Sequence, residues 1–208
     1  MEKRWMMLWL AVGWALGVAA QQTVESIREA YQEYSQRLVT SLKDCPYPPE
    51  YYHLEVVQNL PGTGGHREDV YMLWDEVPDE EDEGNPYPPH VLRYATCKYN
   101  FAAREFYEEY LFDQQGRLMF VYARTPGYDF NYLQEYRLYF DGGRLLKCVV
   151  KNADHDYDAR DIPASAFKEV YNGSTIPEEY KEFLEGTDYL DGKRFLELFK
   201  SIDDNTHL

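Results

Sequence analysis

Apolar positions near the start of the chain recur with a helical period. Over residues 23–43 they follow the 3.6-residue repeat and form one face. Thr23 can cap the start of this helix, and Ser26-x-x-Glu29 is an alternative capping box. Prolines in the segment 45–49 end it, because proline has no amide hydrogen for a continuing helix. The expected apolar face consists of Val24, Ile27, Tyr31, Tyr34, Leu38 and Leu42.

Between Tyr51 and Lys151 the period changes to two, and turn residues recur at the spacing of β-hairpins. The clearest turns are Asp113-Gln114-Gln115-Gly116 and Asp141-Gly142-Gly143, since glycine adopts the positive φ of tight hairpins. This pattern predicts an antiparallel meander. The expected strands are Tyr51–Gln58, Arg67–Asp75, His90–Lys98, Glu105–Phe112, Arg117–Arg124, Tyr132–Phe140 and Arg144–Val150.

Two of these hairpins resemble each other in sequence. Leu111-Phe112-Asp113, a turn and Gly116-Arg117-Leu118 recur as Tyr139-Phe140-Asp141, a turn and Gly143-Arg144-Leu145. A solenoid usually needs three or more repeats, so two copies predict a repeated hairpin unit within one sheet.

Helical signals return after the strands. Ser174 or Thr175 can cap a helix that has Pro177 in its first turn and stops at Gly186. A last helix carries Phe195, Leu198, Phe199 and Ile202. We therefore expect one α+β domain over residues 21–208, with the N-terminal helix and the C-terminal helices packed on a twisted antiparallel meander of about seven strands. The helices are expected on one face of this sheet, which leaves the other face wet.

The first residues have the pattern of a secretory signal. Lys3 and Arg4 precede an apolar run, and the small residues Val18 and Ala20 occupy the −3 and −1 positions of a cleavage site. The run from Trp5 to Ala20 is shorter than the ~20 residues that span a bilayer, and no lipid-attachment cysteine follows it. We expect cleavage of residues 1–20 near Ala20 and export to the periplasm or cell exterior, without stable membrane anchoring.

The charge balance restricts the partners. The chain has 21 basic and 37 acidic residues, a formal net charge of −16. Such a charge repels phosphate backbones and anionic headgroups, so nucleic acid and membrane surfaces are not expected partners. The 20 tyrosines suit both half-buried sheets and contacts with sugars or proteins. The charge allows a basic partner, a cation or a neutral glycan, and a protein or glycan partner is expected.

The three cysteines, Cys45, Cys97 and Cys148, permit at most one internal bridge. In a meander, four inter-strand steps of about 4.8 Å separate Cys97 from Cys148 by roughly 19 Å, whereas a disulfide needs Cα atoms within about 7 Å. We therefore expect no bond between Cys97 and Cys148.

Trp74 lies at the most apolar end of its strand and is expected within the fold.

No motif in the sequence supplies a catalytic or cofactor site. The histidines lack zinc-site spacing and no nucleophile elbow occurs. Leu60-Pro61-Gly62-Thr63-Gly64 matches a cell-wall sorting signal, but it is internal and is interpreted as a connector. We therefore expect no catalytic residue, no metal ligand and no cofactor.

Two acidic segments are candidate cation sites. The run Asp75–Glu83 is expected to be a solvated loop. Asp154, Asp156, Asp158 and Asp161 imitate a calcium loop, but Ala159 and Ser165 stand where a glycine and a glutamate are expected. A solvated turn is the expected structure there, and a loose cation site stays an alternative.

The stretch Lys98–Asp113, together with Asn59–Gly64 and Tyr139–Leu146, resembles an uncharacterised family of exported proteins from gut-dwelling anaerobic bacteria. The resemblance covers about residues 55–151 and implies neither an activity nor a functional residue. The order of helix and meander is also similar to PepSY-like and β-lactamase-inhibitor-like domains, which bind other proteins; this likeness of architecture implies a binding role.

We therefore expect a non-catalytic exported binding module for a protein or glycan partner. Candidate contact residues are the loop aromatics Tyr128, Phe130 and Tyr132, because rings beside an acid or amide can stack on a sugar and hydrogen-bond to it. The alternative for these rings is packing on their own sheet. The alternative functions are a hydrolase of envelope or dietary polymers with paired carboxylates, and a structural envelope component.

Overall fold

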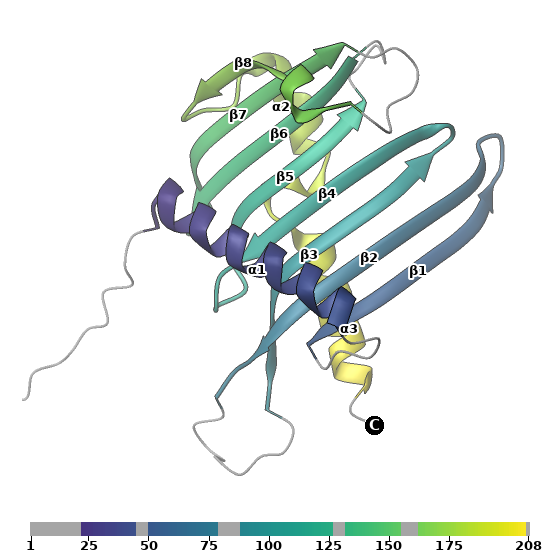
Figure 1. The fold of residues 1–208 in the computed structure, drawn as a ribbon, viewed down its shortest axis with the longest axis vertical. Coiled ribbons are helices and arrows are strands. Elements are labelled where there is room, and N and C mark those ends of the chain that lie inside the picture. The colour runs from purple at the N-terminus through teal and green to yellow at the C-terminus, as the bar shows by residue number, and fades with distance from the viewer. Residues whose placement is uncertain (1–21, 45–49, 79–87, 127–131, 155–161, 207–208) are drawn as a thin grey trace, which may run out of the picture.

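A computed structural model shows an N-terminal helix, an eight-stranded antiparallel sheet and C-terminal helices (Figure 1). It describes residues 22–44, 50–78, 88–126, 132–154 and 162–206. The strands lie in the order β1-β2-β3-β4-β5-β6-β7-β8, so each strand pairs with its neighbours in sequence. The predicted α+β meander is confirmed, with one strand more than the seven expected.

The predicted elements agree closely with the observed ones, except that the helix before Gly186 begins at Glu178 with Pro177 at its N-cap, so neither Ser174 nor Thr175 caps it. The additional strand, β8, has only six residues, too few for a period of two to stand out. The helices are α1 (Val24–Asp44), α2 (Glu178–Glu185) and α3 (Lys193–Thr206), with short 3-10 helices η2 (Ala164–Ala166) and η3 (Asp188–Leu190). The strands are β1 (Tyr51–Leu60), β2 (Gly64–Glu76), β3 (His90–Phe101), β4 (Arg104–Phe112), β5 (Leu118–Pro126), β6 (Tyr132–Asp141), β7 (Arg144–Asp154) and β8 (Lys168–Gly173).

Helix α1 begins with a reciprocal cap. The Ser26 amide donates to Thr23 Oγ1 at 3.1 Å, and the Thr23 amide donates to Ser26 Oγ at 3.0 Å. This arrangement satisfies amides that the first turn leaves free, and it confirms Thr23 as the cap. The apolar face of α1 packs on one face of the sheet. This cluster includes Ile27, Tyr34, Leu38, Leu73, Tyr94 and Leu111.

The C-terminal helices pack on the opposite face, which corrects the expectation that all helices share one face. In Figure 1, α1 lies in front of the sheet and α3 behind it. The reason lies in the central strands: Leu111 and Phe112 are adjacent, so they point to opposite faces, and both are fully buried. Both faces are apolar there and both need a cover. The second cluster includes Tyr110, Phe112, Tyr136, Leu184, Tyr189, Phe195 and Phe199.

The repeated hairpin is confirmed, including a feature that the sequence did not show. The pairing of β4 with β5 shifts register between Leu111 and Phe112. The pairing of β6 with β7 shifts between Tyr139 and Phe140, the equivalent positions of the repeat. A β-bulge thus lies next to the turn in both copies, with Met119 and Leu146 as the extra residues on the second strand, and such a bulge increases the local twist of a hairpin.

The other expectations for the core are also met. Cys97 on β3 and Cys148 on β7 are free and buried, and three strands lie between them. Trp74 is partly buried and stacks on His90, with ring centroids 3.8 Å apart. No helix in the described part of the chain is both long and apolar enough to cross a membrane.

Candidate functional site

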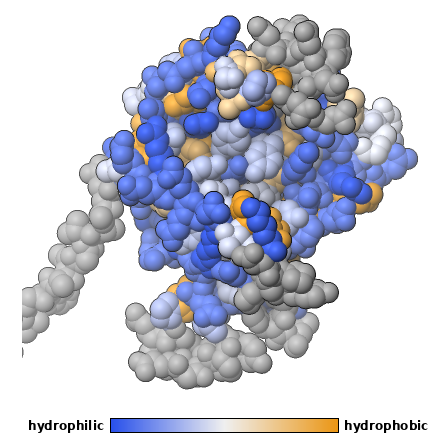
Figure 2. Space-filling view, viewed as in Figure 1, coloured by the Kyte–Doolittle hydropathy of each residue, from blue (hydrophilic) through white to orange (hydrophobic). Residues whose placement is uncertain are grey.

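Helix α1 leaves part of its sheet face open, and a hollow of about 620 Å³ lies between its first half and strands β4 to β6. Figure 2 shows the molecule from this side, where hydrophilic side chains cover most of the surface. The hollow is lined by Arg28, Tyr31, Gln32, Tyr107, Glu109, Phe120, Tyr122, Arg124, Arg137 and Tyr139.

Strand alternation explains why these polar side chains face the hollow. Residues two apart on a strand share a face, and Tyr122 and Arg124 alternate with the buried core residues Val121 and Ala123. The register sets Tyr122 opposite Arg137 and Arg124 opposite Glu135. Burying the apolar residues on the α3 side therefore presents the charged ones on the α1 side.

Glu135 anchors the cationic side chains at this site. Only 3% of this residue is exposed. Its carboxylate lies 2.8 Å from Arg137 Nη2, 3.7 Å from Lys151 Nζ and 3.8 Å from Arg124 Nη2. The Tyr122 hydroxyl donates to it at 3.1 Å. These cations offset the cost of burying the carboxylate, and the carboxylate in turn fixes the two guanidinium groups.

Arg124 and Arg137 each have a hydrogen-bond donor that no acceptor in the described residues uses. The buried Nε atoms of Arg124 and Arg137 have no hydrogen-bond acceptor among the described residues. The two side chains are 32% and 40% exposed, so their outer nitrogens reach the hollow. Arg137 also lies over the Tyr122 ring, 5.6 Å from its centroid. With Glu135 and Lys151, which lie against its lining residues, the hollow brings together four cations (Arg28, Arg124, Arg137 and Lys151) and two carboxylates (Glu109 and Glu135), a local surplus of cations on a protein of net charge −16.

Glu109 is held by tyrosines. It is buried, and the Tyr94 hydroxyl donates to it at 2.6 Å. Burial, and then the charge and hydrogen bonding of Glu109, raise the pKa of Tyr31 and of Tyr107. Burial and the charge of Glu135 raise the pKa of Tyr122 to about 12. At neutral pH these phenols are therefore protonated donors, and they hold Glu109 and Glu135 in place.

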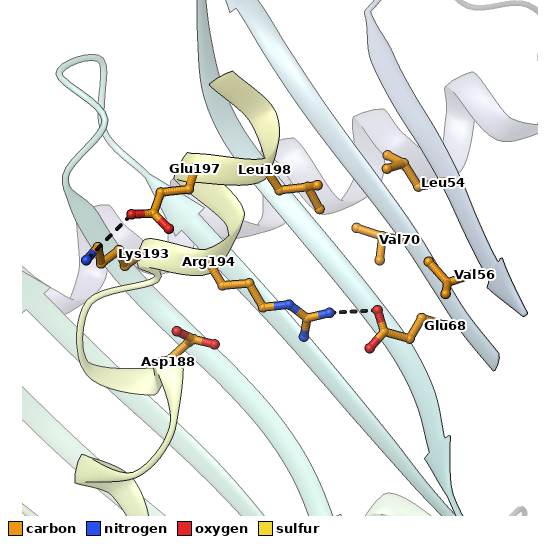
Figure 3. Close-up of a pocket in the computed structure, with 9 residues that line it drawn as sticks. All are labelled: Leu54, Val56, Glu68, Val70, Asp188, Lys193, Arg194, Glu197 and Leu198. Carbon is orange, nitrogen blue, oxygen red and sulfur yellow. Dashed lines mark hydrogen bonds and ion pairs between the residues drawn. The ribbon is translucent and has the colours of Figure 1, made fainter. Parts of the chain in front are cut away.

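A second hollow, of about 540 Å³, lies between α3 and the first two strands (Figure 3). Its apolar wall is formed by Leu54, Val56, Val70 and Leu198. Its two cations are outnumbered by three lining carboxylates: Arg194 lies 2.7 Å from Glu68, Lys193 lies 3.5 Å from Glu197, and Asp188 is the third. A third hollow, of about 460 Å³, includes His90 and Asp203, whose side chains are 2.7 Å apart. Neither has the surplus of cations that marks the α1-side hollow.

The structure describes none of the three side chains that the sequence analysis predicted as contacts. Tyr128 and Phe130 fall outside the described residues. Tyr132 begins β6, and its side chain also falls outside them. The loop that carries them joins β5 to β6, both of which line the hollow. The site residues that the sequence analysis missed are Arg124, Glu135 and Arg137; their alternation with apolar residues was visible but was interpreted only as a wet sheet face.

The first acidic segment differs from expectation at Asp75 and Glu76, which both belong to β2. Asp75 belongs to β2 and not to a solvated loop: the Tyr34 hydroxyl donates to it at 2.6 Å, and Arg93 pairs with it at 2.7 Å. Residues 79–83 of that run lie outside the described residues. Asp154 ends β7, and Asp156, Asp158 and Asp161 lie outside. The described residues contain no group of three His, Cys, Asp or Glu suited to a metal ion.

Comparison of the chain with known protein families, with curated proteins and with solved structures finds no match.

Proposed function

We propose that this protein is a non-catalytic exported binding module whose α1-side hollow binds an acidic glycan. The observation that carries the proposal is the convergence of Arg28, Arg124 and Arg137 with five aromatic rings on an otherwise acidic protein. Export rests on the pattern of residues 1–20.

The chemistry of the lining suits a sugar that carries a carboxylate. A guanidinium group presents paired donors that match the two oxygens of a carboxylate. Tyrosine rings offer an apolar face for the sugar ring and a hydroxyl for its polar groups. Arg124 and Arg137 stand beside Tyr122, so charge recognition and ring stacking are available within one site.

The buried carboxylates favour binding over hydrolysis. Glu135 is surrounded by Arg124, Arg137 and Lys151, and Glu109 accepts from Tyr94. The protein itself therefore supplies the partners of both carboxylates: three cations and the Tyr122 hydroxyl for Glu135, and the Tyr94 hydroxyl for Glu109. Both groups therefore act by holding donors in position.

The loop between β5 and β6 extends this proposal. It begins after Pro126, two residues beyond Arg124. We propose that Tyr128, Phe130 and Tyr132 add stacking surface at this end of the hollow. Tyr128→Ala is then expected to weaken glycan binding less than loss of Arg137 does, because it removes a ring and no charge.

Calorimetric titration with an acidic oligosaccharide, such as oligogalacturonate, tests the proposal. Arg137→Gln should weaken binding about 10- to 100-fold, since a hydrogen bond to a charged group contributes about 1.5–3 kcal/mol. Arg144→Gln makes the same charge change in the β6–β7 turn, outside the hollow, and should leave binding unchanged.

Two results would contradict the proposal. One is equal loss of affinity in Arg137→Gln and Arg144→Gln, which would indicate unspecific charge attraction. The other is a panel of acidic oligosaccharides with no binder. A neutral oligosaccharide of matched length serves as the ligand control, and its binding should not exceed that of the acidic form. Moderate salt should weaken the acidic ligand selectively because salt screens exposed charges.

A further inference from the structure

Strand β1 forms one edge of the sheet, and of the features that protect exposed edges it has a single acidic side chain, Glu55. It has ten residues and pairs in continuous register with β2, its one partner strand in the described part of the chain. Natural edge strands are usually shortened, bulged or interrupted by lysine or proline. β1 has no lysine, arginine or proline, and its Val57 is 67% exposed.

The opposite edge is protected. β8 has six residues, includes Lys168 and Glu169, and pairs with β7 through a register shift between Val150 and Lys151. The β1 edge can therefore pair with another strand more easily than the β8 edge can. A partner strand is expected at β1 and not at β8.

We propose that β1 pairs antiparallel with β1 of a second copy of this chain, about a two-fold axis through Leu54. The two eight-stranded sheets would then continue into one another. A two-fold axis perpendicular to the sheet keeps the α1 side of one copy next to the α1 side of the other. Side chains from the same face therefore meet across the junction.

This register makes the strand complementary to itself. On the α1 side, His53 of each copy lies opposite Glu55 of the other, and Tyr51 lies opposite Val57. On the α3 side, Leu54 meets Leu54 on the axis, and Tyr52 lies opposite Val56. Aromatic–β-branched pairs at such positions each contribute about 0.2–1 kcal/mol to a sheet.

The neighbouring registers that preserve the faces are poorer. An axis through Glu55 sets two glutamates opposite each other, which is destabilising. An axis through Val56 sets Glu55 opposite Val57 and Leu54 opposite Gln58. An axis through His53 sets Glu55 opposite Tyr51. Of these four registers, only the axis through Leu54 places a tyrosine opposite a valine on both faces of the sheet and sets no glutamate opposite an apolar side chain or another glutamate.

The hollow beside α3 supports the same arrangement. Leu54 and Val56 form the β1 side of this hollow, and Leu198 faces them from α3 (Figure 3). Tyr52 of the second copy would lie beside Val56 and add apolar surface at the open side of the hollow. Association would therefore bury apolar side chains that a single copy leaves partly exposed.

Cysteine cross-linking tests both the contact and its register. In a Cys45→Ser background, Leu54→Cys places two thiols on the axis, where opposite Cα atoms are about 4.5–5.5 Å apart, within the range of a disulfide. Val57→Cys is the matched control: it is more exposed, but in this register it lies about 20 Å from its copy. We expect a covalent dimer from Leu54→Cys and none from Val57→Cys. Cross-linking of Val57→Cys alone, or of both at equal rates, would overturn the register.

Sedimentation velocity tests the association itself. The wild-type protein should show a concentration-dependent dimer, and Leu54→Lys should be monomeric because it sets two ammonium groups on the axis. Val170→Lys introduces the same group on the exposed face of the other edge strand and should leave the dimer intact. Circular dichroism checks that each variant is folded. A wild-type protein that stays monomeric up to about 100 μM, a concentration at which even micromolar contacts are populated, would overturn the proposal. Glycan binding at β4 to β6 is measured separately, so the two proposals can fail independently.

Discussion

Glu108 and Glu109 are neighbours on β4, yet their carboxylates lie on opposite faces of the sheet, and each is held by tyrosine hydroxyls. Glu108 accepts from Tyr99 and Tyr110 at 3.0 Å and from Tyr189 at 3.1 Å. Glu109 accepts from Tyr94 at 2.6 Å on the other side.

This pair connects the three layers of the fold. Tyr189 belongs to η3, whereas Tyr31, whose pKa is raised in part by a hydrogen bond with Glu109, belongs to α1. Both helical layers are thus hydrogen-bonded to one strand through adjacent residues. Because buried carboxylates need full hydrogen bonding, each glutamate also constrains where its helix can pack.

Glu108 should make the fold less stable as the pH rises. Burial raises the pKa of Glu108, and the hydrogen bonds from Tyr110, Tyr99 and Tyr189 oppose this only in part. A carboxyl whose pKa is higher in the folded state binds its proton more tightly there. Its contribution to the free energy of unfolding is therefore greatest below the unfolded pKa of about 4.3 and declines as the pH rises through the folded pKa.

Glu108→Gln should lack this decline in urea unfolding between pH 4 and 8. Parallel pH profiles for the variant and the wild type would contradict the expectation, and Glu105→Gln, at an exposed site on the same strand, is the control.

Asp75 should stabilise the docking of α1 in the opposite pH range. Burial alone would raise its pKa, but hydrogen bonds from Tyr34 and Arg37 and the charges of Arg37 and Arg93 lower it. A lowered pKa stabilises the fold above the unfolded value of about 3.9, and this stability is lost as the pH falls through the folded value. Asp75→Asn should cost about 1–3 kcal/mol at pH 7.

The cost of Asp75→Asn should shrink below about pH 4, where the wild-type carboxylate is itself becoming protonated. Thermal unfolding at pH 7 and pH 3 measures the difference. The neighbouring exposed Glu76→Gln should change little at either pH. A cost for Asp75→Asn that is the same at both pH values would show that the carboxylate charge is not the cause.

Gly192 should not tolerate a side chain. It has a φ of +63°, and a Cβ there would lie 2.9 Å from the ring of the buried Phe112. Gly143, with a φ of +84° and open space around it, is the matched control for backbone strain. Gly143→Ala should cost about 1–2 kcal/mol from the left-handed conformation alone. Gly192→Ala should cost about 1–3 kcal/mol more, as overpacking does. Equal losses in chemical denaturation would mean that Phe112 moves aside freely.

Cys97 and Cys148 should be unreactive in the native protein. Burial raises the pKa of Cys148 to about 11 and, together with the charge of Glu108, that of Cys97 to about 12. At pH 8 both therefore remain thiols, and the thiolate is the reactive form. In the Cys45→Ser variant, a thiol reagent should label no cysteine before unfolding and two after it. Native labelling at the rate of free cysteine would contradict their burial.

The sequence by itself determined the local elements and their order. The 3.6-residue period identified α1, and the period of two with glycine turns identified the strands of the meander. These signals are local because helix and hairpin geometry depend on residues close together in the chain. The repeated hairpin belongs to the same class: its turns were evident in the sequence, and the equivalent bulges at Met119 and Leu146 then followed in the structure.

Only the tertiary structure decided which layers cover which face and where the candidate site forms. A period shows that an element has an apolar face but not what covers it, so α1 and α3 could be assigned to opposite faces only from packing. Pairing of β5 with β6 brings Arg124 and Arg137 beside Glu135 and Tyr122, and the packing of α1 adds Arg28 to the same hollow. The net charge of −16 suggested a uniformly acidic surface. A sum over the chain carries no positions, however, and the fold concentrates a local surplus of cations that this sum conceals.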